Sequence, residues 1–297
     1  MTSNIGFVGV GAMGWPMAAN LIKAGFKLQV ADARPAQASK FAAESGARVA
    51  ASLRALGEAS DVVITMLPTS RIVHAVLLDP DGVAAGLRPG ALVIDMSSGV
   101  PAETALIAKE LAARKVAMLD APVSGGVRKA LTGELAIMVG GDKDAVARAE
   151  PILRAMGRSV IRAGGIGSGQ AMKALNNLVS AGGFLIGMEA LLVGKKFGLD
   201  PAVMVDILNA STGMNNSTQV KFKQYVLSGT FGAGFSLDLM VKDVGIALDV
   251  AQSLGVNAPF SALCRNIWAA AQADLGPGHD HTELARFAAK TAGVSLE

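Results

Sequence analysis

Near its start the chain reads Ile5-Gly6-Phe7-Val8-Gly9-Val10-Gly11-Ala12-Met13-Gly14, an apolar run that passes into closely spaced glycines. The run predicts a buried strand, and the apolar periodicity that follows predicts a helix. In such a strand–turn–helix, Gly9 permits the tight turn, Gly11 lets the backbone approach a pyrophosphate, and Gly14 lets helix and strand pack closely. The helix N-terminus supplies unpaired N–H groups for the phosphates. We therefore expect a dinucleotide to bind at Gly9, Gly11, Ala12, Met13 and Gly14.

The end of the second predicted strand indicates which dinucleotide binds. Asp32 lies there, 18 residues after Gly14. A carboxylate at this place can accept hydrogen bonds from the ribose hydroxyls and would repel a 2′-phosphate, which favours NAD over NADP. Arg34 could instead hold a 2′-phosphate, or it could be a solvated loop charge. We expect NAD as the cofactor, with NADP as the alternative.

Short β-branched runs alternate with helical patterns through the first half of the chain. The predicted strands are Ile5–Val10, Leu28–Ala31, Val62–Met66, Leu92–Asp95, Val116–Leu119, Leu135–Val139 and Val160–Arg162. The predicted helices among them are Met13–Ala24, Pro35–Ser45, Ala102–Arg114 and Ala145–Met156. Strands that alternate with helices and are apolar on both faces form a doubly wound parallel α/β sheet of the Rossmann type.

The pattern changes at the glycine-rich segment 164–169. Beyond it no run is typical of a strand, and a long apolar helical pattern continues to about Lys196. We therefore expect a dinucleotide-binding Rossmann domain over residues 1–164 and an all-helical substrate and oligomerisation domain over residues 165–297. The long helix should join the two.

Composition argues against several classes of protein. The 27 Lys and Arg against 24 Asp and Glu give a net charge of +3 without a basic run, so a nucleic-acid partner is not expected. A hydrophobic content of 51% and a mean hydropathy of +0.43 raise the question of a membrane span. The most apolar stretch, Ala174–Gly194, is interrupted by Asn176, Asn177, Ser180 and Glu189, which disfavours a span. The single cysteine, Cys264, excludes an internal disulfide. We expect a cytoplasmic protein without a bound metal.

Two further segments have the residue types of a site. The stretch Asp120-Ala-Pro-Val-Ser124-Gly125-Gly126 follows a predicted strand, at the sheet edge where open α/β sheets bind ligands. Its hydroxyl and backbone N–H groups could bind a small carboxylate, or it could be an ordinary turn. On the long helix, Lys173 and Asn177 are four residues apart and share a face. From the residue pattern alone, the Lys173 side chain could extend to solvent or could belong to a functional site, and neither alternative is favoured.

The sequence resembles the β-hydroxyacid dehydrogenase family, the group that contains 3-hydroxyisobutyrate dehydrogenase and tartronate semialdehyde reductase. Four segments in order carry the resemblance: Gly6–Gly14 with Met17-Ala18 and Asn20-Leu21, Asp120–Gly126, Gly169–Asn177, and the pair Lys242-Asp243. The resemblance implies that Lys173 is the acid–base residue and that Asn177 orients the substrate hydroxyl and the lysine. A free lysine, with a pKa of about 10.4, is a poor base, so such a role requires burial or nearby cations.

The resemblance also implies further contacts, of which Lys242 and Phe231 would not be singled out by spacing alone. It places Ser124, Gly125, Gly126 and Phe231 at the substrate, and Leu67, Pro68, Ser98 and Lys242 at the cofactor. Ser98 would lie near the nicotinamide ribose, with Ser97 as a competing assignment. The segment His279–His281, by contrast, has a solvated tail as its simplest interpretation, with an opportunistic metal site as the alternative.

The function that follows is NAD-dependent oxidation of a small 3-hydroxy acid to its semialdehyde, with 3-hydroxyisobutyrate as the first substrate to test. Alternatives within the family are reduction of tartronate semialdehyde or glyoxylate, and oxidation of L-threonate, L-serine or a sulfonated analogue. An imine-reducing relative would usually replace the lysine, which is present here. A catalytically silent NAD-binding sensor or scaffold is the alternative outside enzymes. The family leads us to expect a homodimer or homotetramer that binds a small carboxylate.

Overall fold

The computed structural model describes residues 3–295 of the chain, which forms two compact units that divide between Lys173 and Ala174. The first unit holds a nine-stranded sheet. Its strands are β1 (Asn4–Val8), β2 (Lys27–Ala31), β3 (Arg48–Val49), β4 (Val62–Thr65), β5 (Leu92–Asp95), β6 (Ala117–Asp120), β7 (Val123–Ser124), β8 (Ala136–Gly140) and β9 (Ser159–Gly164).

The strand order is β3-β2-β1-β4-β5-β6-β8-β7, with β9 paired to β8. The pairs from β3 to β6 are parallel, which confirms the predicted Rossmann-type sheet. The sheet departs from a purely parallel one at β8, which runs antiparallel to β6 and to β7. An apolar run such as β8 has the same pattern in either direction, so its sequence could not reveal the reversal.

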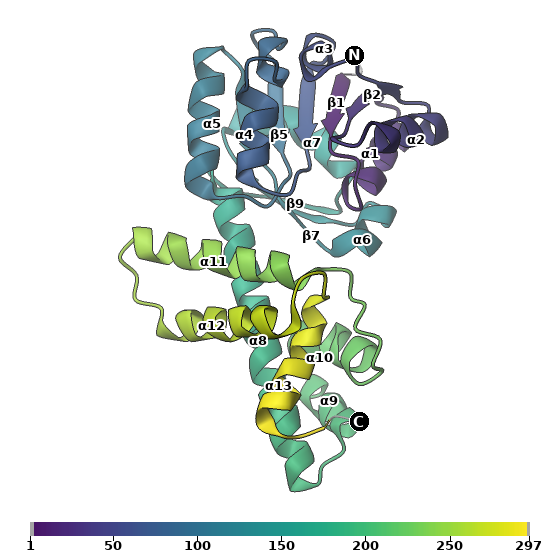
Figure 1. The fold of residues 1–297 in the computed structure, drawn as a ribbon. Coiled ribbons are helices and arrows are strands. Elements are labelled where there is room, and N and C mark those ends of the chain that lie inside the picture. The colour runs from purple at the N-terminus through teal and green to yellow at the C-terminus, as the bar shows by residue number, and fades with distance from the viewer. Residues whose placement is uncertain (1–2, 296–297) are drawn as a thin grey trace. The chain divides into compact units, whose positions relative to one another are not determined.

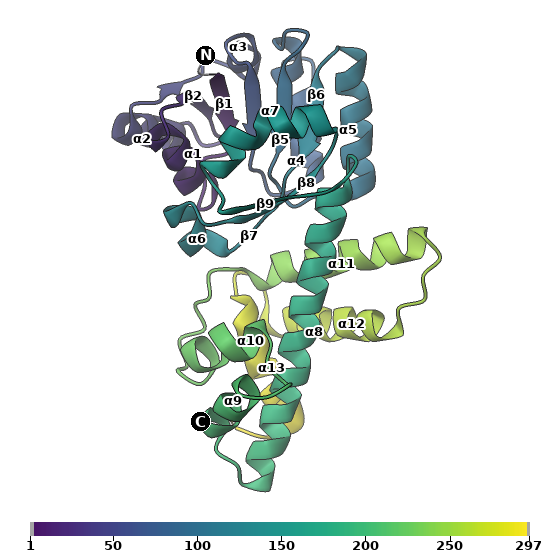
Figure 2. The ribbon, with the colours of Figure 1, turned by 180° about the vertical axis from the view of Figure 1, so that it is seen from behind.

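Helices cover both faces of the sheet (Figures 1 and 2). They are α1 (Gly14–Lys23), α2 (Pro35–Ser45), α3 (Leu53–Glu58), α4 (Ser70–Leu78), the short η1 (Val83–Ala85), α5 (Pro101–Ala113), α6 (Gly126–Thr132) and α7 (Lys143–Arg154). Successive side chains of β4 point to opposite faces of the sheet, so each face has its own layer of helices. Val62 and Ile64 belong to the core under α1 and α7. Val63, between them, belongs to the core under α3, α4 and α5.

Apart from an isolated bridge between Ser236 and Asp280, the regular elements in the described residues of the second unit are all helices. Its elements are most of α8 (Ser168–Phe197), then α9 (Pro201–Asn209), α10 (Asn216–Val220), the π-helical η2 (Phe222–Val226), α11 (Leu237–Ser253), α12 (Pro259–Leu275), the short η3 (His281–Glu283) and α13 (Leu284–Ala292). Their core gathers around α8, which contributes Ala181, Phe184, Leu185, Met188, Leu191 and Leu192. The predicted all-helical region and its long helix are therefore confirmed.

Helix α8 is the one helix in the described part of the chain that is long and apolar enough to cross a membrane. Its most apolar window is 56% buried within the protein. Phe184 and Met188 are fully buried in the core of the second unit. Such burial is what a core helix of a soluble protein shows.

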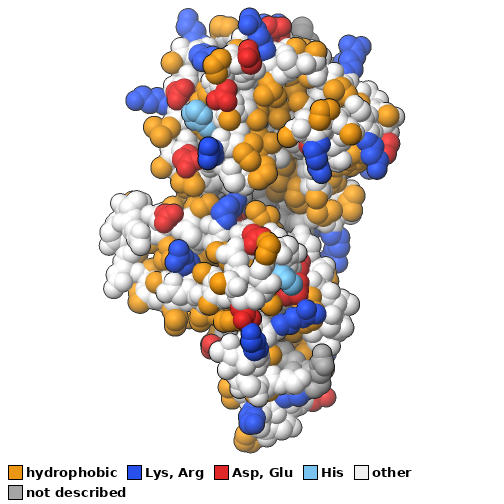
Figure 3. All heavy atoms as spheres, in the orientation of Figure 1, with side chains coloured by type: hydrophobic (Ala, Val, Ile, Leu, Met, Phe, Trp, Pro, Cys, Tyr) orange, Lys and Arg blue, Asp and Glu red, His pale blue; other side chains and the backbone are white. Residues whose placement is uncertain are grey.

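Charged side chains of both signs are exposed on the face of the protein that Figure 3 draws. On the face drawn in Figure 3, Lys and Arg lie scattered among Asp and Glu rather than in one continuous patch. This arrangement agrees with the small net charge of +3.

Candidate active site

The glycine-rich turn between β1 and α1 has the geometry that its sequence predicts. Gly9 has a φ of 97°, in the left-handed region that favours glycine. A Cβ on Gly14 would lie 1.8 Å from the carbonyl oxygen of Gly9, so only glycine allows this approach of helix to strand. A Cβ on Gly11 would meet no protein atom within 4 Å. The protein's own packing therefore does not require glycine at residue 11, whereas a ligand lying against that backbone would.

The N-terminus of α1 faces this turn and suits an anion. Its N-cap residue, Met13, makes no side-chain capping hydrogen bond, and the first turn has no acidic residue. Ala12 is exposed and Met13 is half-buried. The first N–H groups of a helix need partners, and the positive end of the helix dipole favours negative charge. The turn thus fits the pyrophosphate of a dinucleotide.

Asp32 lies beside the same turn, at the end of β2. Its carboxylate accepts a hydrogen bond from the backbone N–H of Val10 at 3.0 Å and one from that of Arg34 at 2.9 Å. The Arg34 guanidinium is 3.6 Å from the carboxylate and its side chain is 70% exposed. Gln37 donates to the carbonyl of Val10 at 2.9 Å, which fixes the turn from α2. The carboxylate and the guanidinium that would discriminate NAD from NADP are therefore adjacent.

The loops after β4 and β5 contain the next predicted cofactor contacts. The backbone N–H of Leu67 donates to Ser97 Oγ at 2.9 Å, and Ser97 is fully buried. Ser98 is only half-buried, and Pro68 is exposed. Because the Ser97 hydroxyl serves the neighbouring loop, Ser98 is the better placed of the two serines to meet a ligand.

Two carboxylates for which we predicted no role of their own lie at the ends of neighbouring strands. Asp95 on β5 and Asp120 on β6 are register partners, and both are buried. Burial raises the pKa of Asp95 to about 6, although hydrogen bonds from Ser97 and Thr65 favour its ionised form. Burial also raises the pKa of Asp120, against hydrogen bonds from the backbone of Gln170 and Gly167.

The raised pKa of Asp95 predicts how stability changes with pH. The pKa of Asp95 is 3.8 in the unfolded reference and about 6 in the folded protein. The folded protein therefore binds the carboxyl proton of Asp95 more tightly than the unfolded chain does. The resulting stabilisation is present below about pH 4 and is lost as the pH rises through 6. Asp95→Asn cannot ionise. We therefore expect its unfolding free energy to rise relative to that of the parent between pH 4 and 7, by roughly 3 kcal/mol at most.

Thermal unfolding of both proteins across that range would measure this effect. The difference in Tm should widen toward neutral pH. A difference that stays constant with pH would contradict a raised pKa at Asp95.

The segment after β6 has the backbone geometry of a binding turn. Ser124 ends β7 and is half-buried, and Gly125 is exposed with a φ of 131°. Gly126 has a φ of 65° and begins α6. Such glycine conformations turn successive N–H groups toward one side, an arrangement that suits a small carboxylate. Asp120, which begins this segment in the sequence, instead serves the first turn of α8.

Helix α8 begins against the carboxyl edge of the sheet. The Asp120 carboxylate accepts hydrogen bonds from the backbone N–H groups of Gly167 at 2.7 Å and Gln170 at 2.8 Å. Lys173 follows one turn later and is 8% exposed, and Asn177 is 6% exposed. The spacing of four places both on one face of the helix. The predicted site features of the first unit lie at or after the carboxyl ends of strands. They are the glycine-rich turn, Asp32, Ser98, Ser124 and the start of α8.

In the second unit, Asn177 is held by a carboxylate on α11. Asn177 Nδ2 donates to Asp243 Oδ2 at 2.6 Å, and Lys242 Nζ lies 3.4 Å from Asp243 Oδ1. Asp243 is 1% exposed, so it is a buried carboxylate that links Asn177 to Lys242. Asn176 Nδ2 also donates to Asn177 Oδ1, at 3.0 Å. Asp243 is in the sequence motif, but its contact with Asn177 spans 66 residues and could not be derived from spacing.

Phe231 lies in the loop between η2 and α11. Its φ is 45°, which is unusual for a residue with a side chain. The Arg286 guanidinium stacks on the ring at 4.3 Å from its centroid, a cation–π contact. The backbone N–H of Phe231 donates to the carbonyl of Tyr225 at 3.0 Å. A held conformation of this kind is common at ligand sites, but substrate contact by Phe231 stays a prediction.

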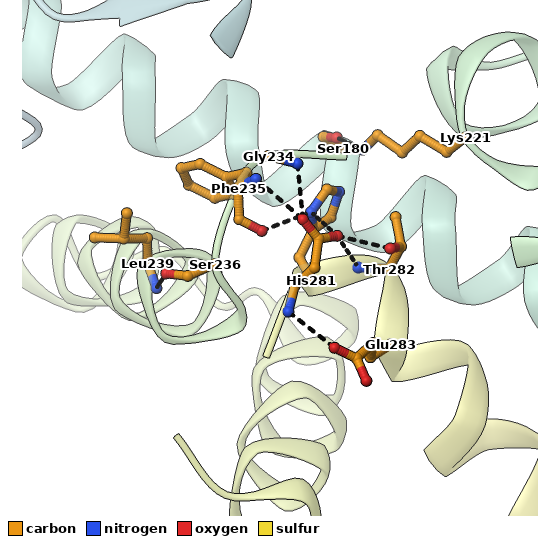
Figure 4. Close-up of polar contacts among 10 residues, drawn as sticks. Ser180, Lys221, Gly234, Phe235, Ser236, Leu239, His281, Thr282 and Glu283 are labelled. Atoms are coloured by element: carbon orange, nitrogen blue, oxygen red, sulfur yellow. Dashed lines mark hydrogen bonds and ion pairs between the residues drawn. The ribbon is translucent and has the colours of Figure 1, made fainter. Parts of the chain in front are cut away.

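The interpretation of His279–His281 as a solvated tail is wrong. His281 is 3% exposed, and its ring packs against Phe184, Phe235 and Trp268. The Asp280 carboxylate accepts hydrogen bonds from the backbone N–H groups of Gly234, Phe235 and Thr282 and from the Thr282 hydroxyl. Burial opposes ionisation, but contacts with His281 and Thr282 outweigh it and hold the pKa of Asp280 below its usual value. Figure 4 shows the polar contacts around His281 and Thr282, together with Lys221 and Ser180.

Two family models match nearly the whole chain. Residues 4–165 match the NAD-binding domain of 6-phosphogluconate dehydrogenase. Residues 167–288 match the model described as the NAD-binding domain of NADP-dependent 3-hydroxyisobutyrate dehydrogenase.

Individual relatives match the chain over most of their length. The chain is 41% identical to 3-hydroxyisobutyrate dehydrogenase of Pseudomonas aeruginosa, over 92% of this chain and 93% of the relative. It is 35% identical to 2-(hydroxymethyl)glutarate dehydrogenase of Eubacterium barkeri, over 98% and 97%. Among solved structures, 3-hydroxyisobutyrate dehydrogenase of Mycobacterium tuberculosis with L-serine superposes with a TM-score of 0.88 at 34% identity, covering 97% of this chain and 99% of that one.

Proposed function

Because this chain is an oxidoreductase of the β-hydroxyacid dehydrogenase family, we propose that it oxidises a small 3-hydroxy acid to its semialdehyde with NAD. The observation that carries the proposal is the start of α8, where buried Lys173 follows a turn anchored to the carboxyl edge of a dinucleotide-binding sheet. Our lead substrate is 3-hydroxyisobutyrate, the substrate in the name of the 41% identical relative. Asp32 supports NAD over NADP.

The cofactor would be held by the groups at the carboxyl edge of the sheet. The glycine-rich turn and the N-terminus of α1 would bind the pyrophosphate, and Asp32 would accept hydrogen bonds from the ribose. Leu67, Pro68 and Ser98 would line the rest of the cofactor, and Lys242 would lie at its nicotinamide end. Bound NAD supplies the hydride acceptor for this chemistry.

The protein's own part is to bind the acid and move one proton. Ser124, Gly125 and Gly126 would bind the substrate carboxylate through hydroxyl and N–H donors, and Phe231 would contact the carbon chain. In the oxidation, Lys173 Nζ as a neutral amine takes the hydroxyl proton while carbon loses a hydride, which leaves a carbonyl. In the reverse direction the ammonium returns that proton to the forming alkoxide. Asn177, oriented by Asp243, would hold the reacting hydroxyl.

A steady-state panel of hydroxy acids tests this proposal. It should contain 3-hydroxyisobutyrate, 2-(hydroxymethyl)glutarate, L-serine, L-threonate and a three-carbon sulfonate, each with NAD and with NADP, and the semialdehydes of tartronate and 3-sulfolactate in reverse. We expect turnover of at least one three- or four-carbon 3-hydroxy acid, with NAD preferred. Absence of turnover with every member, by a protein that binds NADH, would contradict the proposal.

A further inference from the structure

The side chain of Gln170, on the first turn of α8, is buried, and neither the sequence pattern nor the family resemblance assigned it a role. We propose that Gln170 is a positioning residue, whose carboxamide fixes the backbone on both sides of Ser98 and sets its place relative to Lys173. The proposal rests on the assignment of Ser98 and Lys173 to the proposed reaction.

The carboxamide of Gln170 pairs with the two peptide groups that flank Ser98. Gln170 Nε2 donates to the carbonyl oxygen of Ser97 at 2.8 Å, and the N–H of Gly99 donates to Gln170 Oε1 at 2.7 Å. The Gln170 side chain thus pairs with one backbone carbonyl and one backbone N–H, as the backbone of a neighbouring strand does in a sheet. Gln170 is 1% exposed, so water cannot easily replace either bond.

The backbone after Ser98 is enclosed as well as hydrogen-bonded. A Cβ on Gly99 would lie 2.6 Å from Ser70 Oγ and 3.4 Å from Gln170 Nε2, so a larger residue there would displace the Ser70 hydroxyl. The N–H of Val100 donates to the same Ser70 hydroxyl at 2.8 Å. Segment 97–100 is therefore held from α4 by Ser70 and from α8 by Gln170.

Gln170 is itself anchored to two strands. Its backbone N–H donates to Asp120 Oδ2 on β6 at 2.8 Å, and its Nε2 lies 3.4 Å from Asp95 Oδ2 on β5. Asp95 and Asp120 are register partners, so one residue is tied to both strand ends. Lys173 lies three residues further along α8, about 4.5 Å along the axis of a rigid helix. The backbone at Ser98 and the helix that carries Lys173 therefore share one anchor.

This arrangement matters because hydride transfer requires the nicotinamide and the acid–base group at a fixed separation. A displacement of about 1 Å at a reacting centre can lower the rate by 10²-fold. A positioning residue should therefore affect kcat and cofactor affinity, and it should leave the affinity for the hydroxy acid nearly unchanged.

Gln170→Met tests the proposal, because methionine has a similar length and helix propensity but cannot pair with either peptide group. We expect kcat to fall by about 10- to 100-fold. The Kd for NADH, measured by fluorescence titration, should rise about tenfold. The KM for the hydroxy acid should change less than about twofold. Circular dichroism would establish that the variant is folded under assay conditions.

Gln170→Glu supplies a signature that a merely structural role would not produce. A protonated carboxyl can accept from Gly99 N–H and donate to the Ser97 carbonyl, as the amide does. The ionised form loses the donor. The titratable groups packed against this position are Asp95 from β5 and Asp120 from β6, with Lys173 on the same helix. Relative to the parent, Gln170→Glu should therefore recover NADH affinity and kcat as the pH falls, whereas Gln170→Met should not.

A matched control is Gln272→Met on α12, whose amide donates to Asp238 Oδ1 at 2.6 Å in the second unit. It should leave kcat and NADH affinity unchanged. The proposal is overturned if folded Gln170→Met keeps both quantities within about twofold, or if the two Gln170 variants share one pH profile. NADH titration needs no substrate, so the role of Gln170 can be judged even if the hydroxy-acid panel shows no turnover.

Discussion

Lys173→Ala is expected to lower kcat for the hydroxy acid by about 10²- to 10⁴-fold, the usual effect of removing a general acid–base group. The physical reason is that the alanine variant has no amine to take the hydroxyl proton as hydride leaves carbon. NADH affinity should change little, because the predicted cofactor contacts are made by other residues. Steady-state kinetics and NADH fluorescence titration would measure both quantities.

Two controls make the Lys173 result specific. Lys290→Ala removes a surface lysine on α13 that pairs with Asp274, and it should leave kcat unchanged. Small primary amines added to Lys173→Ala should restore part of the activity, since the missing group is a proton acceptor. Activity within tenfold of the parent would refute the assignment of Lys173.

Asp32→Ser should shift the preference between the cofactors, measured as the ratio of kcat/KM for NADP to that for NAD, by about 10²-fold or more toward NADP. The substitution removes a carboxylate that would repel a 2′-phosphate, and it leaves Arg34 beside the same turn. A lost charge-assisted hydrogen bond to the ribose of NAD contributes about 1.5–3 kcal/mol, and each 1.4 kcal/mol is tenfold.

Adding Arg34→Ala to Asp32→Ser tests the role of Arg34. In the Asp32→Ser background, Arg34→Ala should remove most of the gain with NADP, because Arg34 carries the guanidinium that lies beside residue 32. A parent enzyme that already prefers NADP would show that Arg34 outweighs Asp32. Unchanged preference in Asp32→Ser would refute the assignment of Asp32 to the ribose.

Local patterns in the sequence were sufficient to predict most of the fold. The strand before Gly9, the helix after Gly14 and the long apolar helix from Ser168 each have a periodicity that is readable within one segment. The helices α3, α4 and α6 and the two-residue strands β3 and β7 were not predicted. The two strands and α3 are too short to show a period. The direction of β8 depends on its neighbours in the sheet, which are chosen by tertiary contacts.

The difference between local sequence patterns and tertiary contacts also explains which functional residues could be predicted. Motif residues such as Gly11, Lys173 and Ser124 lie in segments that resemble a family, so they could be named in advance. Gln170 lies in such a segment too, but its partners are 71 and 73 residues away, and no spacing rule reaches that far. His281 was misjudged because its burial comes from aromatic rings that only the folded chain brings together.

The bonds around Asp280 have a consequence for the order in which the chain can fold during synthesis. The sheet of the first unit is complete once Gly164 has been made, so that unit can fold while later residues are still being translated. The loop before α11 cannot be fixed so early, since Gly234 and Phe235 donate to a carboxylate 46 and 45 residues downstream. The entry loop of α11, the helix that carries Lys242 and Asp243, can therefore be held only after Asp280 has left the ribosome.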